Sequence, residues 1–196
     1  MPEDHTHDIW PPFEAFYIEA MLFSTRSAID SIRTANRSLD RSHGWEANPE
    51  LAAADRRVIL NQMQNVVFSG ANLSRYFWPA RSHELSVRRA ERLRSSLHVT
   101  DCSPLKNRDL RNLIEHFDER LDLYLRDGIV GHVFPAYIGN RPEEPDIPVH
   151  LFRAYYTEVA VFEVLGQRFE IKPLLEEVPR LHSALNRCSE TGSRLP

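Results

Sequence analysis

The chain has 196 residues, of which 42% are hydrophobic and 27% are charged, and both values are ordinary for a folded globular protein. Its formal net charge of −4 argues against broad, non-specific affinity for nucleic acid but leaves room for a local basic patch. No run in the sequence approaches the roughly 20 apolar residues that a membrane-spanning helix needs. The N-terminal residues are polar and acidic, unlike a signal peptide, so we expect a cytoplasmic protein with no membrane partner.

Metal and cofactor chemistry has little support in the sequence. Cys102 and Cys188 fit neither a metal-ligand spacing nor a disulfide framework, so we expect two inert thiols. The chain has no phosphate-cradling glycine loop, no Gly-x-Ser-x-Gly elbow and no His-Glu-x-x-His zinc pair. His5 and His7 lie in a leader, residues 1–9, that we predict to be disordered. We therefore expect no metal site and no cofactor.

Hydrophobic periodicity predicts four helices in the first two thirds of the chain. The first runs from 13 to about 40 and has a broad apolar face, which comprises Phe13, Phe16, Tyr17, Ala20, Met21, Phe23, Ala28, Ile29 and Ile32. The second begins at Pro49, with Asn48 as its cap, and stops by residue 78. The third spans 82–99, with Ser82 as a candidate cap. Short connections between them favour an up-and-down four-helix bundle over residues 10–127.

The fourth predicted helix, residues 105–127, has the most regular pattern in the chain. Its apolar residues recur at steps of three and four and place one apolar face along its length: Leu110, Leu113, Phe117, Leu121 and Tyr124. Asp127-Gly128 provides the usual glycine stop. We expect this helix to lie in the core of the bundle.

Beyond Gly128 the pattern changes to short β-branched and aromatic segments, and we expect residues 128–187 to form a β-hairpin or three-stranded antiparallel sheet followed by a short helix. Leu165-Gly166 is a plausible tight turn, which would place Glu163 opposite Arg168 and Phe162 opposite Phe169. The final helix is expected at 173–187, interrupted by Pro179, and the tail 188–196 is expected to be disordered. The predicted fold class is thus mainly α with a small C-terminal sheet.

The third predicted helix is unusually rich in arginine. Its polar face holds Arg88, Arg89, Arg92 and Arg94, Arg81 lies just before it, and only Glu84 and Glu91 offset this charge. One interpretation is a solvated helix face near acidic neighbours. The other is a phosphate-contacting surface, formed by Arg81, Arg88, Arg89 and Arg92, that binds RNA.

The fourth predicted helix also carries Arg111-Asn112-x-x-x-His116, and Arg111-Asn112 is the only Arg-Asn dipeptide in the chain. This pattern resembles the signature of the HEPN superfamily, in which a bundle of four or five helices carries Arg-x(4–6)-His on one helix. The resemblance covers about residues 10–127. It implies a metal-independent endoribonuclease of the toxin or defence type that acts on single-stranded RNA. It also implies a homodimer and an antitoxin or nucleotidyltransferase partner.

The resemblance implies a catalytic role for each motif residue. A neutral His116 would take the proton from a ribose 2′-hydroxyl, and Arg111 would stabilise negative charge on the phosphate. Asn112 would orient the imidazole or the substrate. Arg111 and His116 are five residues apart, about 140° around a helix, so a site needs the reach of the arginine or a second subunit.

Two other interpretations stay open. In the first, the motif helix is a non-catalytic dimer interface that depends on Phe117 and Leu121, and the motif residues pair within the chain: Arg111 with Glu115 and Asp118, and His116 with Glu119 or Arg120. In the second, the protein senses a small molecule in a pocket between the bundle and the hairpin, lined by Tyr155, Tyr156, Phe162 and Phe169.

Overall fold

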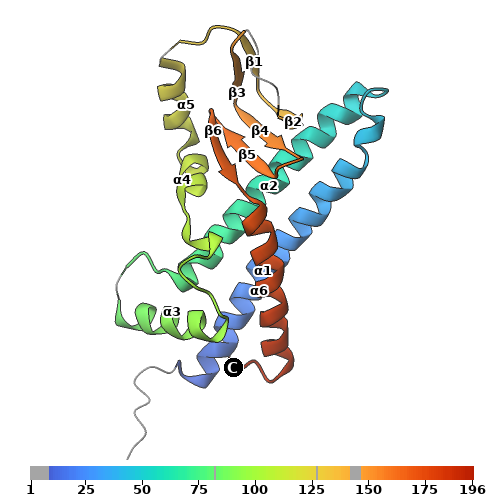
Figure 1. The fold of residues 1–196 in the computed structure, drawn as a ribbon. Coiled ribbons are helices and arrows are strands. Elements are labelled where there is room, and N and C mark those ends of the chain that lie inside the picture. The colour runs from blue at the N-terminus through green and yellow to red at the C-terminus, as the bar shows by residue number, and fades with distance from the viewer. Residues whose placement is uncertain (1–8, 82, 127, 142–146) are drawn as a thin grey trace, which may run out of the picture.

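A computed structural model describes four stretches of the chain: residues 9–81, 83–126, 128–141 and 147–196. Within them the chain is mainly helical and carries a small C-terminal sheet, as predicted (Figure 1). Three sequence predictions concern residues outside these stretches: the disordered leader up to residue 8, the cap at Ser82 and the helix stop at Asp127. Ile9, the last residue of the predicted leader, is buried.

Two long antiparallel helices form the frame of the molecule (Figure 1). They are α1 (Pro11–Asp40) and α2 (Pro49–Phe77), joined through a 3-10 turn at Ser42–Gly44. The predicted cap is confirmed, because the side chain of Asn48 accepts a hydrogen bond from the backbone N–H of Leu51 at 3.0 Å. At the same end, the buried carboxylate of Asp55 accepts hydrogen bonds from Arg41 and from Trp45 Nε1, and the bond from Arg41 lowers its pKa.

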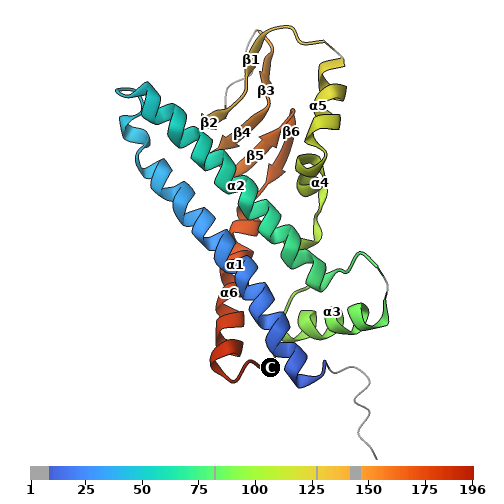
Figure 2. The ribbon, with the colours of Figure 1, turned by 180° about the vertical axis from the view of Figure 1, so that it is seen from behind.

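One core lies at the opposite end of this helical hairpin, where α3 (Glu84–Ser96) and α6 (Lys172–Glu190) pack. Figure 2 shows α6 beside α1, with α3 crossing below the end of α2. The fully buried side chains of this core include Ile18, Met21, Leu22, Leu73, Phe77, Leu93, Leu97 and Leu181. A polar contact adds to the α1–α6 packing, since Thr25 Oγ1 lies 2.9 Å from His182 Nδ1.

The predicted helix at 105–127 is not continuous. A 3-10 turn (Pro104–Lys106) precedes α4 (Asp109–Glu115), and α5 (Phe117–Arg126) follows after a bend at His116, where φ is −110° and ψ is 35°. The bend costs little hydrogen bonding, because His116 N–H still donates to the carbonyl of Asn112 and the carbonyl of His116 accepts from Arg120. Periodicity across residues 105–127 is therefore real but does not reveal the bend.

The sheet is mixed, whereas the sequence predicted antiparallel strands. Its four-stranded part has the order β2-β4-β5-β6, with β2 parallel to β4 and the other pairs antiparallel. A separate parallel pair joins β1 to β3. The bounds of the six strands are β1 His132–Phe134, β2 Tyr137–Gly139, β3 Val149–Leu151, β4 Arg153–Tyr156, β5 Val161–Val164 and β6 Gln167–Glu170.

The predicted β5–β6 hairpin is confirmed in register. Phe162 pairs with Phe169, Glu163 pairs with Arg168, and Arg168 Nε donates to Glu163 Oε2 at 2.7 Å. Leu165 and Gly166 form the turn with φ values of 48° and 77°, as a two-residue hairpin turn requires. The buried hydroxyl of Tyr156 also donates to Glu163 Oε2, and burial together with this carboxylate raises the pKa of Tyr156 to about 12.

The second core lies between the sheet and the other half of the helical hairpin. It joins residues of α2, α4 and the sheet, such as Ile59, Met63, Leu113, Phe162 and Val164. The apolar face of α4 thus packs with the sheet, and α6 occupies the place beside α1. Periodicity gives the face that a helix buries, but it does not identify the element that covers this face.

The C-terminal segment also differs from prediction. The helix α6 continues to Glu190 because Pro179 removes only one donor on an exposed side, while Val178, Leu181 and Leu185 anchor the opposite side. The expected disordered tail is packed: Leu195 is buried and its N–H donates to Glu14 Oε2 at 3.2 Å.

Candidate functional site

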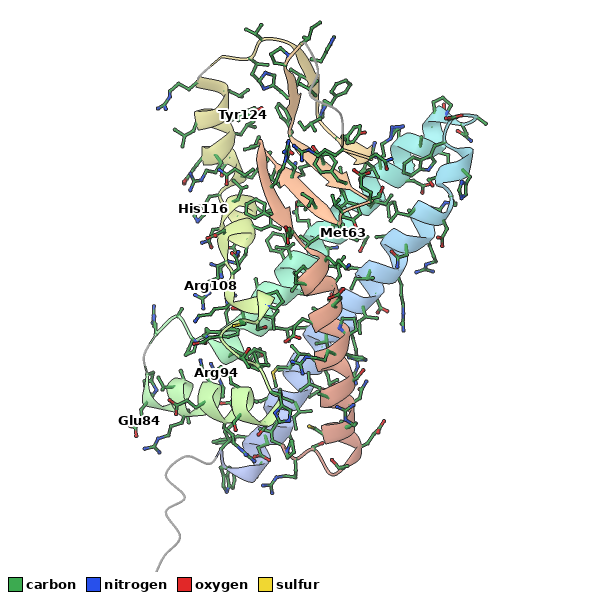
Figure 3. The ribbon with its side chains drawn as sticks, viewed as in Figure 1. Met63, Glu84, Arg94, Arg108, His116 and Tyr124 are labelled. Atoms are coloured by element: carbon green, nitrogen blue, oxygen red, sulfur yellow. The ribbon has the colours of Figure 1, made fainter. Side chains whose placement is uncertain are left out.

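The three motif residues lie around the bend between α4 and α5. Asn107 opens α4 by accepting a hydrogen bond from the N–H of Asp109 at 2.8 Å, and the chain then places Arg111 and Asn112 in its middle. His116 lies at the bend itself, and Figure 3 shows it with Arg108 along the α4 side of the molecule. The motif is therefore at a surface rather than inside a helical core.

Arg111 is held in one place by its own helix. Its side chain is only 16% exposed, its Nε lies 3.3 Å from Glu115 Oε2, and the same atom donates to Asn112 Oδ1 at 3.1 Å. The other carboxylate oxygen of Glu115 lies 3.9 Å from Arg75 Nη2 on α2. In this structure Asn112 thus accepts hydrogen bonds from Arg111, and its predicted role of orienting the imidazole or the substrate stays a prediction.

His116 is more open. Its side chain is 61% exposed, and its one polar neighbour among the described side chains is Glu119, with Nδ1 at 3.8 Å from Oε2. No described contact joins His116 to Arg111. The structure therefore brings Arg111 and Asn112 together but leaves His116 apart, as the helical angle predicted, and it contains the Arg111–Glu115 and His116–Glu119 pairs of the non-catalytic interpretation.

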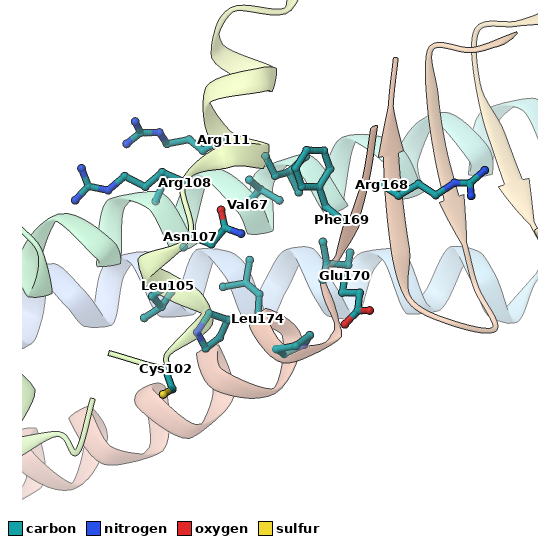
Figure 4. Close-up of a pocket in the computed structure, with 16 residues that line it drawn as sticks. Val67, Cys102, Leu105, Asn107, Arg108, Arg111, Arg168, Phe169, Glu170 and Leu174 are labelled. Atoms are coloured by element: carbon teal, nitrogen blue, oxygen red, sulfur yellow. The ribbon is translucent and has the colours of Figure 1, made fainter. Parts of the chain in front are cut away.

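A cavity of about 390 Å³ lies beside the motif helix (Figure 4). Its apolar lining includes Val67, Leu105, Leu110, Phe169 and Leu174, and its polar or charged lining residues include Asn107, Arg108, Arg111, Arg168 and Glu170. In Figure 4 the side chains of Arg108 and Arg111 extend to the same side, whereas Arg168 points away beyond β6. Arg108 and Arg111 thus both line this cavity, and His116 does not.

Of the four predicted RNA-binding arginines, three do not contact a buried carboxylate of the described residues, and the fourth, Arg92, does. Arg81 and Arg88 are exposed, although Arg88 forms an ion pair with Glu84. Arg89 lies over the rings of Tyr17 and Tyr76, at 5.5 and 5.6 Å from their centroids, and donates to the carbonyl of Arg75.

Arg92 is the arginine that contacts a buried carboxylate. It is 26% exposed, and its Nη2 lies 3.8 Å from the buried carboxylate of Glu14. Glu14 also accepts a hydrogen bond from Arg194 Nε at 2.6 Å. A buried carboxylate needs such cations, so Arg92 has a structural role beside Glu14.

The sequence did not predict a group of exposed aromatic residues on α1 and at Trp10, just before it. Phe16 and Phe23 are 74% and 75% exposed, and Trp10 and Phe13 are exposed too, although we predicted Phe13, Phe16 and Phe23 to face the core. The signal was available, because Phe16 lies about 160° around the helix from Ile18, which is buried. A single apolar stripe cannot include both residues.

Trp10, Phe13 and Phe23 line two hollows that share Arg89, whereas Phe16 lines neither hollow. One hollow, of about 500 Å³, is lined by Phe23, Tyr76, Arg75 and Arg89 together with small residues of α1 and α2. The other, of about 170 Å³, is lined by Trp10, Phe13, Tyr17 and Leu85 together with Arg88 and Arg89. We call this surface, which comprises Trp10, Phe13, Phe16, Phe23, Arg75, Arg88 and Arg89, the aromatic–arginine face.

The aromatic residues proposed for a sensor pocket mostly belong to the cores. Tyr155, Tyr156 and Phe162 are buried, and only Phe169 lines a cavity, the one beside the motif helix. Within the described residues, no three His, Cys, Asp or Glu side chains gather as metal ligands, and no helix has the length and hydropathy needed to cross a bilayer.

Comparisons with known proteins provide no relative of this chain. No model of a protein family, no curated protein and no solved structure matches the chain.

Proposed function

We propose that this protein binds single-stranded RNA on the aromatic–arginine face and cleaves it as a dimeric, metal-independent endoribonuclease of the HEPN type, in a toxin or defence role. The observation that carries the proposal is the alternation of exposed rings with arginines around Arg89. Bases of single-stranded RNA stack on such rings, each with about 1–3 kcal/mol, while arginines attract the phosphates. Monomeric proteins rarely leave several large aromatic residues exposed together, as Phe13, Phe16 and Phe23 of α1 are with Trp10 just before it, without a binding partner.

A series of charged side chains connects the aromatic–arginine face with the motif. Arg75 lines the larger hollow and also reaches Glu115, which in turn pairs with Arg111. Arg108 is fixed beside them by a hydrogen bond to the carbonyl of Trp78. An RNA strand that follows the arginines from α3 across the end of α2 would therefore reach Arg111 on α4.

In the proposed cleavage, His116 accepts the proton of a ribose 2′-hydroxyl. The 2′-oxygen then bonds to phosphorus, the bond from phosphorus to the 5′-oxygen breaks, and the departing oxygen takes a proton from water. Arg111, already oriented by Asn112, stabilises the negative charge that develops on the phosphate. Because Arg111 and His116 do not meet within one chain, a second copy supplies the arginine or the histidine. In this proposal, α1, α2, α3 and α4 correspond to the four helices of a HEPN-like bundle.

An RNA cleavage assay in EDTA tests the catalytic part. We expect wild-type protein to cut a single-stranded RNA at neutral pH, and His116→Ala and Arg111→Ala to lose at least about a hundredfold in rate. His43→Ala is the matched control, because His43 is also exposed but lies at the far end of α1 and α2. If wild-type protein leaves RNA intact, or if His116→Ala cuts as fast as wild type, the catalytic proposal is wrong.

Binding is tested separately by fluorescence anisotropy with the same RNA. Phe23→Ala should weaken binding about fivefold or more, since one stacking ring is removed. Phe134→Ala is the control, because Phe134 is 45% exposed on β1, away from this face. Equal affinity of Phe23→Ala and wild type would contradict RNA binding at this face.

A non-catalytic module is the second candidate, and one observation favours it. Both Arg111 and His116 already have an acidic neighbour in their own chain, so the motif is satisfied without substrate. Phe117 and Leu121 no longer support a dimer contact in this candidate, because both pack against the second core. Here RNA would bind without being cut, and sedimentation of Arg111→Ala would show whether the motif helix joins two copies.

A further inference from the structure

A fourth cavity, separate from the three described above, lies at the other end of α2. This open cavity of about 780 Å³ is lined by one face of α2, by the link between β1 and β2, and by β4: Ala53, Arg56, Arg57, Leu60, Asn61, Gln64, Pro135, Ala136 and Arg153. Arg57 precedes Arg75 by 18 residues, which is about 27 Å along the helix. The cavity is therefore separate from the aromatic–arginine face.

The polar lining of this cavity is entirely cationic or amide. Arg56, Arg57 and Arg153 contribute three guanidinium groups, and no aspartate or glutamate is among the lining residues. Within the described part of the chain none of the three forms an ion pair, whereas other arginines of the same half do, such as Arg41 with Asp55. The cavity thus carries concentrated positive charge without an acidic partner from the described residues.

Arg153 has the most unfavourable environment of the three. Its guanidinium lies 4.0 Å from the ring centroid of Phe117, and its Nε is fully buried with no hydrogen-bond partner in the described structure. Burial alone lowers the pKa of this guanidinium, with no acidic group to offset the effect. A partly buried cation that lacks a counter-ion costs free energy, and an anion in the cavity would recover part of it.

Arg56 is positioned in advance for a ligand. Its Nε donates to the carbonyl of Ala52 at 3.3 Å and its guanidinium lies over the ring of Trp45, 5.5 Å from the centroid. Both contacts fix its direction while leaving its charge without a carboxylate partner. Arg57 is exposed at the mouth of the same cavity.

We propose that this cavity binds a small organic phosphate, with Arg56, Arg57 and Arg153 on the phosphate and Asn61 and Gln64 on the sugar or base. Guanidinium groups bind phosphate oxygens in bidentate pairs, which favours phosphate over a simple carboxylate. The carboxamides offer both donors and acceptors to a neutral polar group. The volume lies within the usual range for small-molecule sites, about 300–1,000 Å³. This proposal does not depend on RNA cleavage.

Calorimetric titration of the full chain at low salt tests it with three probes: inorganic pyrophosphate, a hexose phosphate and a nucleoside monophosphate. We expect saturable one-to-one binding of at least one organic phosphate, tighter than that of pyrophosphate. Arg57→Gln and Asn61→Ala, both at exposed positions of α2, should weaken this binding roughly tenfold and threefold, respectively. Arg153→Gln should abolish it, provided that its thermal unfolding shows a folded protein.

Arg37→Gln is the matched control, because Arg37 is exposed and lacks an acidic partner among the described residues but lies on α1 outside the cavity. Binding that falls equally in Arg37→Gln would be general attraction to positive charge and would overturn the proposal. So would the absence of saturable binding for all three probes, or affinities unchanged in Arg57→Gln. If instead Arg57→Gln impairs single-stranded RNA binding while the small phosphates do not bind, the cavity belongs to an RNA surface and the proposal fails.

Discussion

Arg194 provides the sharpest test of the structure, because the sequence placed it in a disordered tail. Its Nε donates to Glu14 Oε2 at 2.6 Å, and Glu14 is 1% exposed. Replacing Arg194 with alanine leaves that carboxylate with the more distant Arg92, at 3.8 Å, and the N–H of Leu195. A disordered residue would have no such effect.

The expected loss can be worked out from these contacts. A hydrogen bond between charged groups contributes about 1.5–3 kcal/mol, and removing a partner of a buried charge costs more. The Arg194 side chain is 54% exposed, which favours the lower part of the range. We therefore expect Arg194→Ala to lower the free energy of unfolding by about 2 kcal/mol, and the midpoint of thermal unfolding by about 4–8 °C for a chain of this size.

Urea denaturation measures this loss, with Arg187→Ala as the control because Arg187 is an exposed arginine of α6. A double-mutant cycle with Glu14→Gln should give a coupling of about 1–2 kcal/mol between Glu14 and Arg194. A midpoint for Arg194→Ala equal to that of Arg187→Ala, or a coupling near zero, would refute the packed tail.

Three further predictions concern other parts of the fold. Burial, with nearby arginines, lowers the pKa of His182 from 6.5, so the unfolded chain binds the proton more tightly. Its stabilisation is therefore complete above pH 6.5 and is lost as the pH falls through the lowered value; His182→Gln should flatten this part of a plot of stability against pH. Gly166→Ala should cost about 1 kcal/mol in urea denaturation, because Gly166 has a φ of 77°, whereas Gly44→Ala should change little. Arg92→Gln should destabilise the protein through Glu14 yet leave RNA affinity within about twofold in the anisotropy assay.

Local signals in the sequence predicted the parts of the fold that depend on neighbouring residues. The start of α2 at Asn48-Pro49 and the turn at Leu165-Gly166 were both found, because caps and tight turns are decided within a few residues. The bend at His116 was missed, since the apolar spacing of residues 105–127 continues across it.

The candidate site was predictable only in part. Arg111 and Asn112 are neighbours in sequence, so their contact follows from the helix, and the angular separation of His116 could be calculated. The exposure of Phe16 and Phe23 could have been inferred from the same geometry. By contrast, Arg92 faces Glu14 across 78 positions of the chain, and no local pattern relates them.

By itself the sequence determined the mainly helical class, the cap of α2, the β5–β6 turn, and the chemistry available at Arg111 and His116. Only the tertiary structure decided what each face meets: α4 packs with the sheet, α6 lies beside α1, and the Nε of the half-buried Arg153 is enclosed without a hydrogen-bond partner among the described residues. The physical reason is that hydrophobic burial is non-directional, so an apolar stripe requires a cover but does not specify one. Which elements meet depends on the packing of the whole chain. The same packing decides whether a charged side chain lies at the surface, beside a charged partner or in a cavity.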